Sequence, residues 1–297
     1  SDASGVDNLG SVLADGGKVI MTADVARNTA KAAVNNAGFV SARSIITGKN
    51  GEIILSGKGG DVVNSGTLDV SGTQASPNAG QVRITSDRNI NLTDTSRILA
   101  NGAGQLGRGG NVRIIADDTL LFTRGATIQG RGGLGGGFVE LSGHKALRVR
   151  GALDLGQGGT VLLDPDFLTI ANGSGSSGSN AGDATVYEAF IEGQLRNGTD
   201  VALVARKEIT LADLEDGVLD GTYGAEQGGN LFVGIGDIGV GTEFGVYSGD
   251  FSGTPPGFVP GTGDAAYDGI VFADTTNTIR VDGNIDIRGG TTYGDLV

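Results

Sequence analysis

The chain has 297 residues, with 56 glycines, no cysteine and a formal net charge of −13. The lack of cysteine excludes disulfides and Cys/His metal clusters, and no run of 18 apolar residues is present that could form a transmembrane helix. The acidity disfavours nucleic acid and anionic membranes as partners. It indicates a solvated surface whose charges keep the chain monomeric, with a specific cationic partner as the alternative.

The N-terminal residues Ser1–Gly5 have none of the features of a signal peptide. We therefore expect either that a signal was removed or that the chain is an excised fragment.

Glycine precedes the same alternating apolar pattern at spacings of 34, 29, 30, 27 and 22 residues. The successive members are Gly17 with Val19 and Met21, Gly51 with Ile53 and Leu55, Gly80 with Val82 and Ile84, Gly110 with Val112 and Ile114, Gly137 with Val139 and Leu141, and Gly159 with Val161 and Leu163. A repeat of this length holds two or three short strands, so the pattern predicts an all-β solenoid with one repeat per coil. Collagen would need glycine at every third position, and a disordered chain has no reason to keep a period of two.

The coil that begins at Gly80 shows three strand-like pieces: 81–85, 89–93 and 97–100. We expect the glycines between such pieces to form corners that need a positive φ. Aromatic residues make up only 5% of the chain, which indicates a thin core of Val, Ile, Leu and Ala. By strand alternation, Val139 and Leu141 should point inward and Glu140 outward.

One segment early in the chain departs from the strand pattern. Residues 23–34 are rich in alanine, place apolar side chains at helical spacing and follow Thr22, a possible N-cap. This predicts a short helix that packs on the rod.

The organisation changes beyond residue 171. We expect regular coils over residues 1–171, a connector rich in glycine and serine over 172–183, and continued β-helix with longer insertions over 184–297. Further strands are predicted by the apolar pieces 201–204, 209–211, 231–233, 279–281 and 285–287.

Residues 249–268 contain three prolines and cannot form a central strand, so they are expected to protrude as a loop. Its aromatic residues Phe251, Phe258 and Tyr267 are the candidate carbohydrate-binding residues, because rings held by prolines can stack on sugars. The alternative is that these rings cover the side or end of the last coils.

The titratable residues offer few catalytic constellations. The acid pairs are Asp117 with Asp118 and Asp164 with Asp166, and both fit turns between strands. His144 is the only histidine and is expected to be a solvated turn residue. Residues 215–220 hold three acids that could make at most a weak calcium site, so no metal and no cofactor are predicted.

Three segments of the chain resemble a known protein family. Residues 17–42, 161–170 and 195–211 resemble the filamentous-haemagglutinin-like exoproteins of bacterial two-partner secretion. The resemblance implies a right-handed parallel β-helix that is secreted through an outer-membrane partner, located outside the cell or on its surface, and used in adhesion or biofilm matrix. The secretion domain of that family is not recognisable, so the chain resembles an interior or C-terminal passenger segment.

Two functions from different classes follow. The first is a non-catalytic adhesin rod that binds exopolysaccharide or a cell-surface glycan, which is the partner that the resemblance implies. The alternative is a polysaccharide lyase or hydrolase, since parallel β-helices also carry such enzymes, with the carboxylate pairs as its catalytic groups. The scarcity of catalytic groups beside a strong repeat favours the rod.

Overall fold

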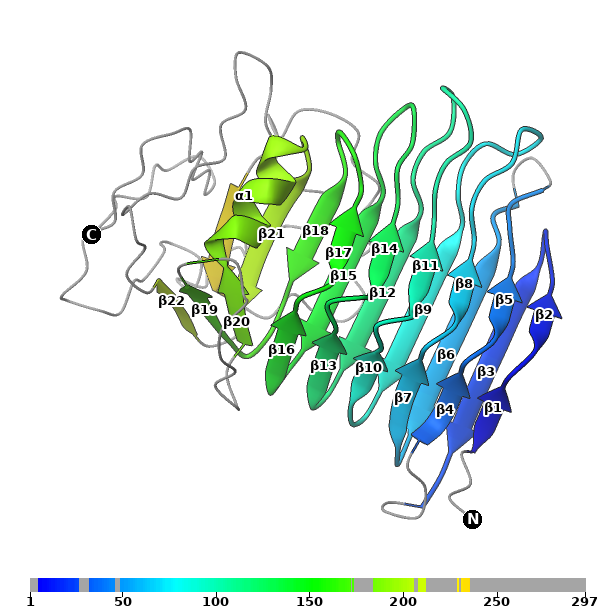
Figure 1. The fold of residues 1–297 in the computed structure, drawn as a ribbon, viewed down its shortest axis with the longest axis horizontal. Helices are drawn as coiled ribbons and strands as arrows, with labels where there is room; N and C mark the ends of the chain where they lie inside the picture. Colours follow the sequence, from blue (N-terminus) through cyan, green and yellow to red (C-terminus); the bar gives the residue numbers. More distant parts are fainter. Residues whose placement is uncertain are drawn as a thin grey trace, which may run out of the picture.

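The computed structural model describes residues 5–26, 32–45, 49–171, 173, 184–205, 208–211, 229 and 231–235. The strands of these residues form three parallel sheets that wind into a β-solenoid (Figure 1). The expected all-β parallel β-helix is therefore confirmed. In the described part of the chain, no helix is long and apolar enough to cross a membrane.

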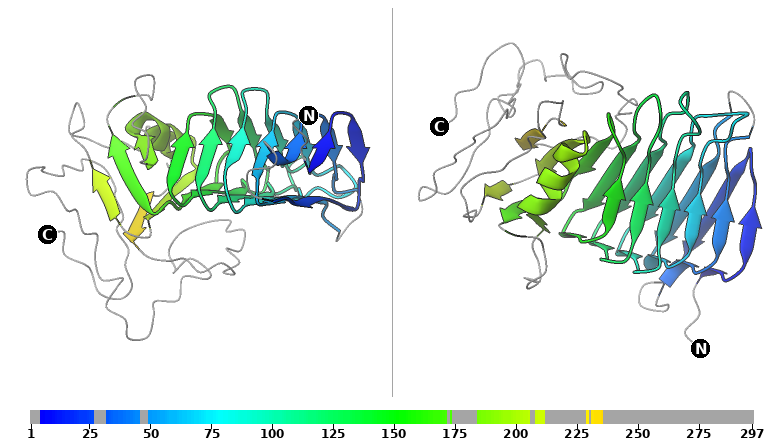
Figure 2. Two further views of the ribbon diagram at one scale, coloured as in Figure 1. Left: turned by 90° about the horizontal axis from the view of Figure 1, so that it is seen from below. Right: turned by 45° about the horizontal axis from the view of Figure 1, so that its top comes forward.

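The sheets, which we call A, B and C, contribute one strand each to a regular coil, and each strand pairs with its counterpart one coil away (Figures 1 and 2). Sheet A runs in the order β1 (Val6–Asn8), β4 (Ala32–Asn36), β7 (Asp61–Asn64), β10 (Ile90–Leu92), β13 (Thr119–Phe122), β16 (Ala146–Val149), β20 (Ala184–Tyr187), β19 (Phe167–Ala171) and β22 (Glu208–Leu211). Sheet B holds β2 (Ser11–Leu13), β5 (Phe39–Ser41), β8 (Thr67–Asp69), β11 (Arg97–Leu99), β14 (Thr127–Gln129) and β17 (Ala152–Asp154). Sheet C holds β3 (Lys18–Asp24), β6 (Glu52–Lys58), β9 (Gln81–Ser86), β12 (Asn111–Ala116), β15 (Phe138–Gly143), β18 (Thr160–Leu163), β21 (Asp200–Ala205) and β23 (Leu231–Ile235).

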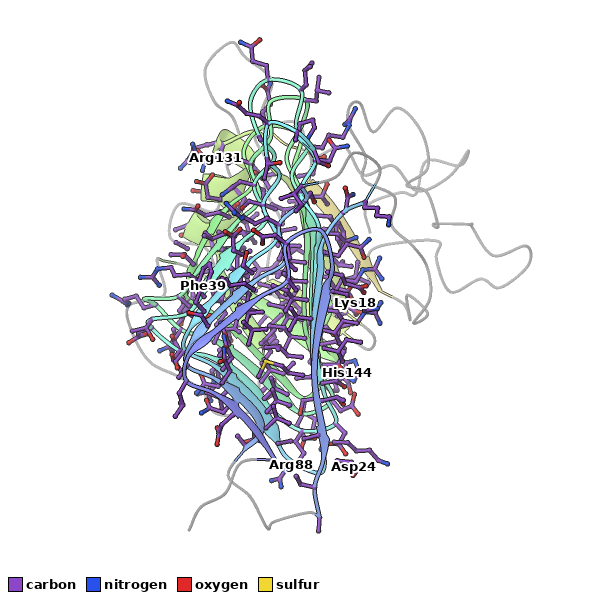
Figure 3. All side chains as sticks on the ribbon, turned by 90° about the vertical axis from the view of Figure 1, so that its right-hand side faces the viewer. Lys18, Asp24, Phe39, Arg88, Arg131 and His144 are labelled. Carbon is purple, nitrogen blue, oxygen red and sulfur yellow. The ribbon has the colours of Figure 1, made fainter. Side chains whose placement is uncertain are left out.

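The core is a set of apolar columns that run along the axis. In sheet C, Ile53, Val82, Val112, Val139 and Val161 are paired in register, and all five are essentially inaccessible to solvent. Each inward side chain therefore packs on its counterparts about 4.8 Å away in the neighbouring coils. Viewed along the axis, side chains from all three sheets fill the interior (Figure 3).

The recurring glycines have a different cause from the one expected. A Cβ on Gly80 would lie 2.1 Å from the carbonyl oxygen of Gly51, and a Cβ on Gly110 would lie 2.3 Å from that of Gly80. The backbones approach too closely at this corner for any side chain, and neither Gly80 nor Gly110 has a positive φ. A positive φ occurs at other corners, for example at Gly104 and Gly156.

The prediction of a helix over residues 23–34 is wrong at both ends of that segment, where the structure has strands. Strand β3 continues to Asp24 and β4 begins at Ala32, while 27–31 lie outside the described residues. Strand β4 pairs with β1 and β7 and buries Ala33 and Val34 completely. Pairing with two neighbouring coils and core burial outweigh the helix propensity of alanine.

The coil after β17 departs from the regular order. Strand β20 lies between β16 and β19 in sheet A, and helix α1 (Glu188–Arg196) follows it, where a strand of sheet B would otherwise come (Figure 1). Ile191 and Leu195 of α1 are buried in the main core, and Gln194 donates a hydrogen bond to the Leu153 carbonyl at 3.2 Å. The sequence pattern did not predict this helix.

The predicted strands at 201–204, 209–211 and 231–233 correspond to β21, β22 and β23. The predicted strands 279–281 and 285–287 and the loop 249–268 lie outside the described residues, as does the connector apart from Gly173. The division of the chain at residues 171 and 184 stays a prediction.

Candidate functional site

The catalytic candidates named from the sequence lie on one edge of the solenoid. From β6 to β19, the chain turns from sheet C to sheet A through a short corner in each coil, and these corners stack on one another. We call this stack of corners the C–A ridge; it comprises residues 58–61, 87–89, 117–118, 144–145 and 164–166. The ridge therefore brings both acid pairs and the histidine onto neighbouring coils.

The backbone of His144 is bonded to the coils on both sides. The amide of His144 donates to the Ala116 carbonyl at 3.0 Å, and its own carbonyl accepts from the Asp166 amide at 2.9 Å. Its Nδ1 lies 3.8 Å from Oδ1 of Asp117, which is too long for a hydrogen bond. His144 lies in the turn between β15 and β16, as expected, but its side chain is only 18% exposed and is therefore mostly covered rather than solvated.

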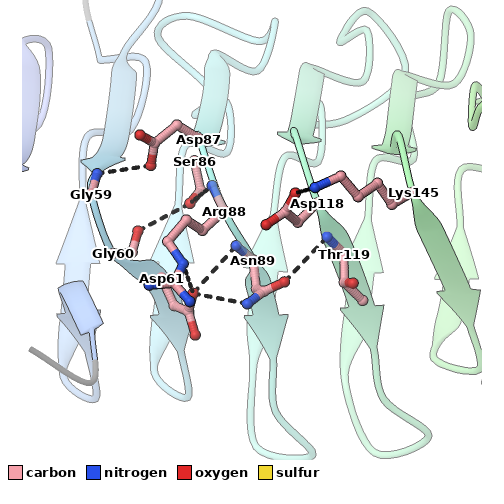
Figure 4. A network of polar contacts seen from close by, with 10 residues as sticks. All are labelled: Gly59, Gly60, Asp61, Ser86, Asp87, Arg88, Asn89, Asp118, Thr119 and Lys145. Atoms are coloured by element: carbon pink, nitrogen blue, oxygen red, sulfur yellow. Dashed lines mark hydrogen bonds and ion pairs between the residues drawn. The ribbon is translucent and has the colours of Figure 1, made fainter. Parts of the chain in front are cut away.

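The pair Asp117 and Asp118 occupies the turn between β12 and β13, as predicted. Asp118 forms an ion pair with Lys145 of the next coil, and its carbonyl accepts the Lys145 amide at 2.9 Å (Figure 4). The Asp117 side chain is 59% exposed. The two neighbouring carboxylates therefore play different parts, since Asp118 ties two coils together and Asp117 faces solvent.

The second acid pair lies in the turn between β18 and β19. Asp164 is 4% exposed, its amide donates to the Leu141 carbonyl, and its carbonyl accepts a hydrogen bond of 2.6 Å from the hydroxyl of Ser142. Asp166 donates its amide to His144. These backbone contacts fix the turn to the preceding coil.

The ridge continues toward the N-terminus as a chain of contacts between coils (Figure 4). Asn89 donates from its side chain to Oδ1 of Asp61 at 2.9 Å, and its own Oδ1 accepts the amide of Thr119 at 3.2 Å. Asp87 accepts the Gly59 amide at 2.8 Å. Each polar group satisfies a backbone or side-chain partner one coil away, so the ridge fastens the stack along its axis.

A second group of contacts between coils lies at another edge, between sheets B and C. Arg43 contacts Oδ2 of Asp15 through Nε at 3.1 Å and through a terminal nitrogen at 2.8 Å, and Ser41 donates to the other carboxylate oxygen. Chiefly through the hydrogen bonds from Arg43, the pKa of Asp15 is lowered to about 2. This arrangement again joins neighbouring coils.

A buried polar ladder at the corner between sheets A and B was not predicted. Asn8, Asn36 and Asn64 pass side-chain hydrogen bonds of 2.7 Å from coil to coil, and Asn64 continues to the Ser96 hydroxyl at 2.6 Å. The signal that could have revealed it is the recurrence of asparagine at intervals of 28 residues.

The remaining sequence candidates are not placed by the structure. The possible carbohydrate-binding residues Phe251, Phe258 and Tyr267, and the acidic residues at 215–220, lie outside the described residues. Within the described ranges, no group of three or more acidic or histidine side chains is arranged to hold a metal ion.

No family model matches the chain, and no curated protein is significantly similar to it.

Proposed function

We propose that this chain is a non-catalytic rod of a secreted bacterial adhesin of the filamentous-haemagglutinin-like class. In this proposal it mediates attachment or the cohesion of a biofilm matrix by binding exopolysaccharide or a cell-surface glycan. The full-length protein would leave the cell through an outer-membrane secretion partner and act outside the cell or on its surface.

The observation that carries the proposal is that polar side chains of the C–A ridge contact the neighbouring coils. Asp87, Asn89 and Asp118 each contact a group one coil away, so these side chains serve the stacking of the rod. A glycosidase needs two carboxyl groups that face a bound sugar across roughly 5–10 Å. On the ridge, Asp118 is held in an ion pair and Asp164 is almost fully buried, so in neither acid pair do both carboxyl groups face a sugar.

The repeated architecture supports the same function. A stack of coils joined by parallel pairing and continuous apolar columns forms a long, stable spacer, which is what an adhesin needs to hold a binding region away from a surface. The acidic surface keeps such rods soluble and separate. The family and the sugar partner rest on the resemblance of residues 17–42, 161–170 and 195–211.

A paired binding and cleavage assay tests the proposal. The purified chain is passed over immobilised acidic and neutral exopolysaccharides, and the polymers are then assayed for new reducing ends and for unsaturated products. We expect retention on at least one polymer without cleavage. Cleavage that is lost in the double variant Asp118→Asn/His144→Gln would instead establish the enzyme alternative, and failure to bind any polymer would refute the adhesive role.

A further inference from the structure

Four arginines gather at the corner between sheets A and B. Arg97 begins β11, Arg124 lies in the turn between β13 and β14, Arg148 belongs to β16, and Arg150 follows that strand. Strands β10, β13 and β16 pair with one another in sheet A, and β11, β14 and β17 pair in sheet B, so the turns that link them stack side by side (Figure 1). We call the four residues the arginine corner.

The register brings these side chains onto one outer surface. Arg148 and Arg150 are separated by a single buried residue and therefore both point outward. Strand β16 pairs with β13, which places Arg150 beside the turn that holds Arg124. A terminal nitrogen of Arg97 donates to the carbonyl of Gly125 at 2.8 Å, next to Arg124 in the chain. Arg97, Arg124 and Arg150 are exposed, and Arg148 is partly exposed.

The arginine corner differs from the other basic groups of the solenoid in its lack of carboxylate partners. Eight basic residues elsewhere form an ion pair with an acidic residue: Lys18, Arg43, Lys58, Arg88, Arg113, Arg131, Lys145 and Arg196. Among the residues that the structure describes, Arg124, Arg148 and Arg150 form no ion pair, and Arg97 donates to backbone carbonyl oxygens.

Two carboxylates belong to the same stack of turns, and both are held by backbone amides. Asp94 accepts the amide of Gly125 at 3.2 Å, and a hydrogen bond from the Thr123 hydroxyl lowers the pKa of Asp94. Glu188, which follows β20, accepts the amide of Gly173 at 3.0 Å. Four arginines and two carboxylates leave a formal charge of 4 − 2 = +2 at this corner, whereas the whole chain has a formal charge of −13.

We propose that the arginine corner binds an acidic polysaccharide whose sugars carry carboxylate groups. This inference rests on the proposed role in polysaccharide binding, and it names the class of polymer and the site. A guanidinium group binds a carboxylate through two parallel N–H donors, and an unpaired guanidinium is available to do so. Coils about 4.8 Å apart present the arginines one after another, so a chain of uronic acids that lies along the rod meets them in succession.

The acidity of the rest of the chain favours a polymer with widely spaced charges. At physiological ionic strength, charges more than about 8 Å apart are largely screened, so the local charge of the corner governs binding. DNA carries a negative charge about every 1.7 Å along its axis, and it would be repelled by the acidic surface around the corner. A polyuronate also has many neutral hydroxyl groups, for which Thr93 and Thr95 offer hydrogen-bonding partners beside Asp94.

Binding of the full chain to polygalacturonate, measured by biolayer interferometry, tests the inference. The matched ligand is the methyl ester of the same polymer, which has the same backbone without the charge. We expect binding to the acid form alone, with loss of binding as the salt concentration rises from about 0.1 M to about 1 M. Equal binding of the ester would overturn the inference and leave the proposed function standing. Failure to bind any polysaccharide would refute both.

Substitutions then locate the site. The triple variant Arg124→Gln/Arg148→Gln/Arg150→Gln should bind polygalacturonate about tenfold or more weakly, because three charged contacts are lost. The control variant has the same change in formal charge, at three ion-paired cations whose side chains are 69–72% exposed: Lys58→Gln, Arg131→Gln and Lys145→Gln. It should keep the affinity of the parent protein within about twofold.

Two results would contradict this assignment. Equal weakening in both variants, with circular dichroism spectra unchanged, would show that net charge and not the arginine corner governs binding. Binding of double-stranded DNA as tightly as polygalacturonate, with the same loss in the triple variant, would show that the corner is a nucleic-acid site and not a polysaccharide site.

Discussion

Asn36 donates its side-chain amide to Oδ1 of Asn64 at 2.7 Å, and both side chains are completely buried. The same group in Asn8 donates to Asn36, so a single amide column crosses three coils. An amide side chain has both a donor and an acceptor, which lets it bond to the coil on either side. The column therefore fixes the register of the first coils in a way that apolar contacts alone do not.

Replacing Asn36 by alanine should lower the free energy of unfolding by about 3 kcal/mol, because two buried polar groups, on Asn8 and Asn64, lose their partners. The measurement is urea unfolding followed by circular dichroism. Asn35→Ala, which removes a surface hydrogen bond to Asp7, is the control and should cost about 0.5 kcal/mol. Similar costs for the two variants would mean that the ladder does not stabilise the stack.

Gly80→Ala should be severely destabilising, by about 3 kcal/mol or more, because the new Cβ would lie 2.1 Å from the Gly51 carbonyl oxygen and force two coils apart. Gly10→Ala is the matched control, since a Cβ there meets no atom within 4 Å. Its effect should stay within about 1 kcal/mol. Comparable melting temperatures for both variants would contradict the close approach at this corner.

Glu140→Gln should slightly raise stability at pH 7. Burial raises the pKa of Glu140, so the neutral carboxyl group favours the folded state below the ordinary pKa of 4.5. This contribution to stability is lost as the pH rises through the raised pKa and the group ionises. The glutamine variant lacks this loss, so its advantage over the parent protein should shrink toward pH 4. Denaturant unfolding at several pH values measures the difference.

Leu141→Asp provides the contrast, because this neighbouring side chain is fully buried in the main core. An unpaired charge there should cost several kcal/mol. If Glu140→Gln and Leu141→Asp changed stability equally, the strand register would be wrong.

Asp15→Asn should remove part of the acid sensitivity of the fold. The pKa of Asp15 is lowered from 3.8 to about 2, so its contribution to stability is present above pH 4 and is lost as the pH falls from about 4 to about 2. The variant should show a flatter dependence of the melting temperature on pH in this window. Asp24→Asn, whose pair with Lys58 is largely exposed, should keep the slope of the parent protein.

Replacing residues 249–268 by a short glycine-containing turn tests the candidate sugar-binding residues Phe251, Phe258 and Tyr267. We expect reduced retention on exopolysaccharide, because stacked rings contribute much of the affinity for a sugar. A triple alanine variant of the three aromatic residues is the matched control for the change in loop length and should show the same loss. Undiminished retention by a stable variant would place the binding site elsewhere on the rod.

The candidate site was predictable as residue types and not as an arrangement. Asp118, His144 and Asp166 were recognised as corner residues from their positions between strands. Asp118 pairs with Lys145, and the His144 side chain is mostly covered. Both features depend on how the corners of different coils stack. Such contacts join residues more than 20 positions apart, and the pattern of a single coil contains no information on them.

The sequence by itself determined the coil and its inward face. Glycine followed by alternating apolar residues, as in Gly110 with Val112 and Ile114, has one arrangement that buries those side chains, and that arrangement is a strand in a stacked coil. Only the tertiary structure decided the conformation of residues 32–34 and 188–196. Ala32 and Ala33 became part of strand β4 because neighbouring coils supplied hydrogen-bonding partners on both sides, whereas residues 188–196 became helix α1 in the coil after β17, where they bury Ile191 and Leu195 in the core. Local propensity is worth tenths of a kcal/mol per residue, and pairing and burial across coils are worth more.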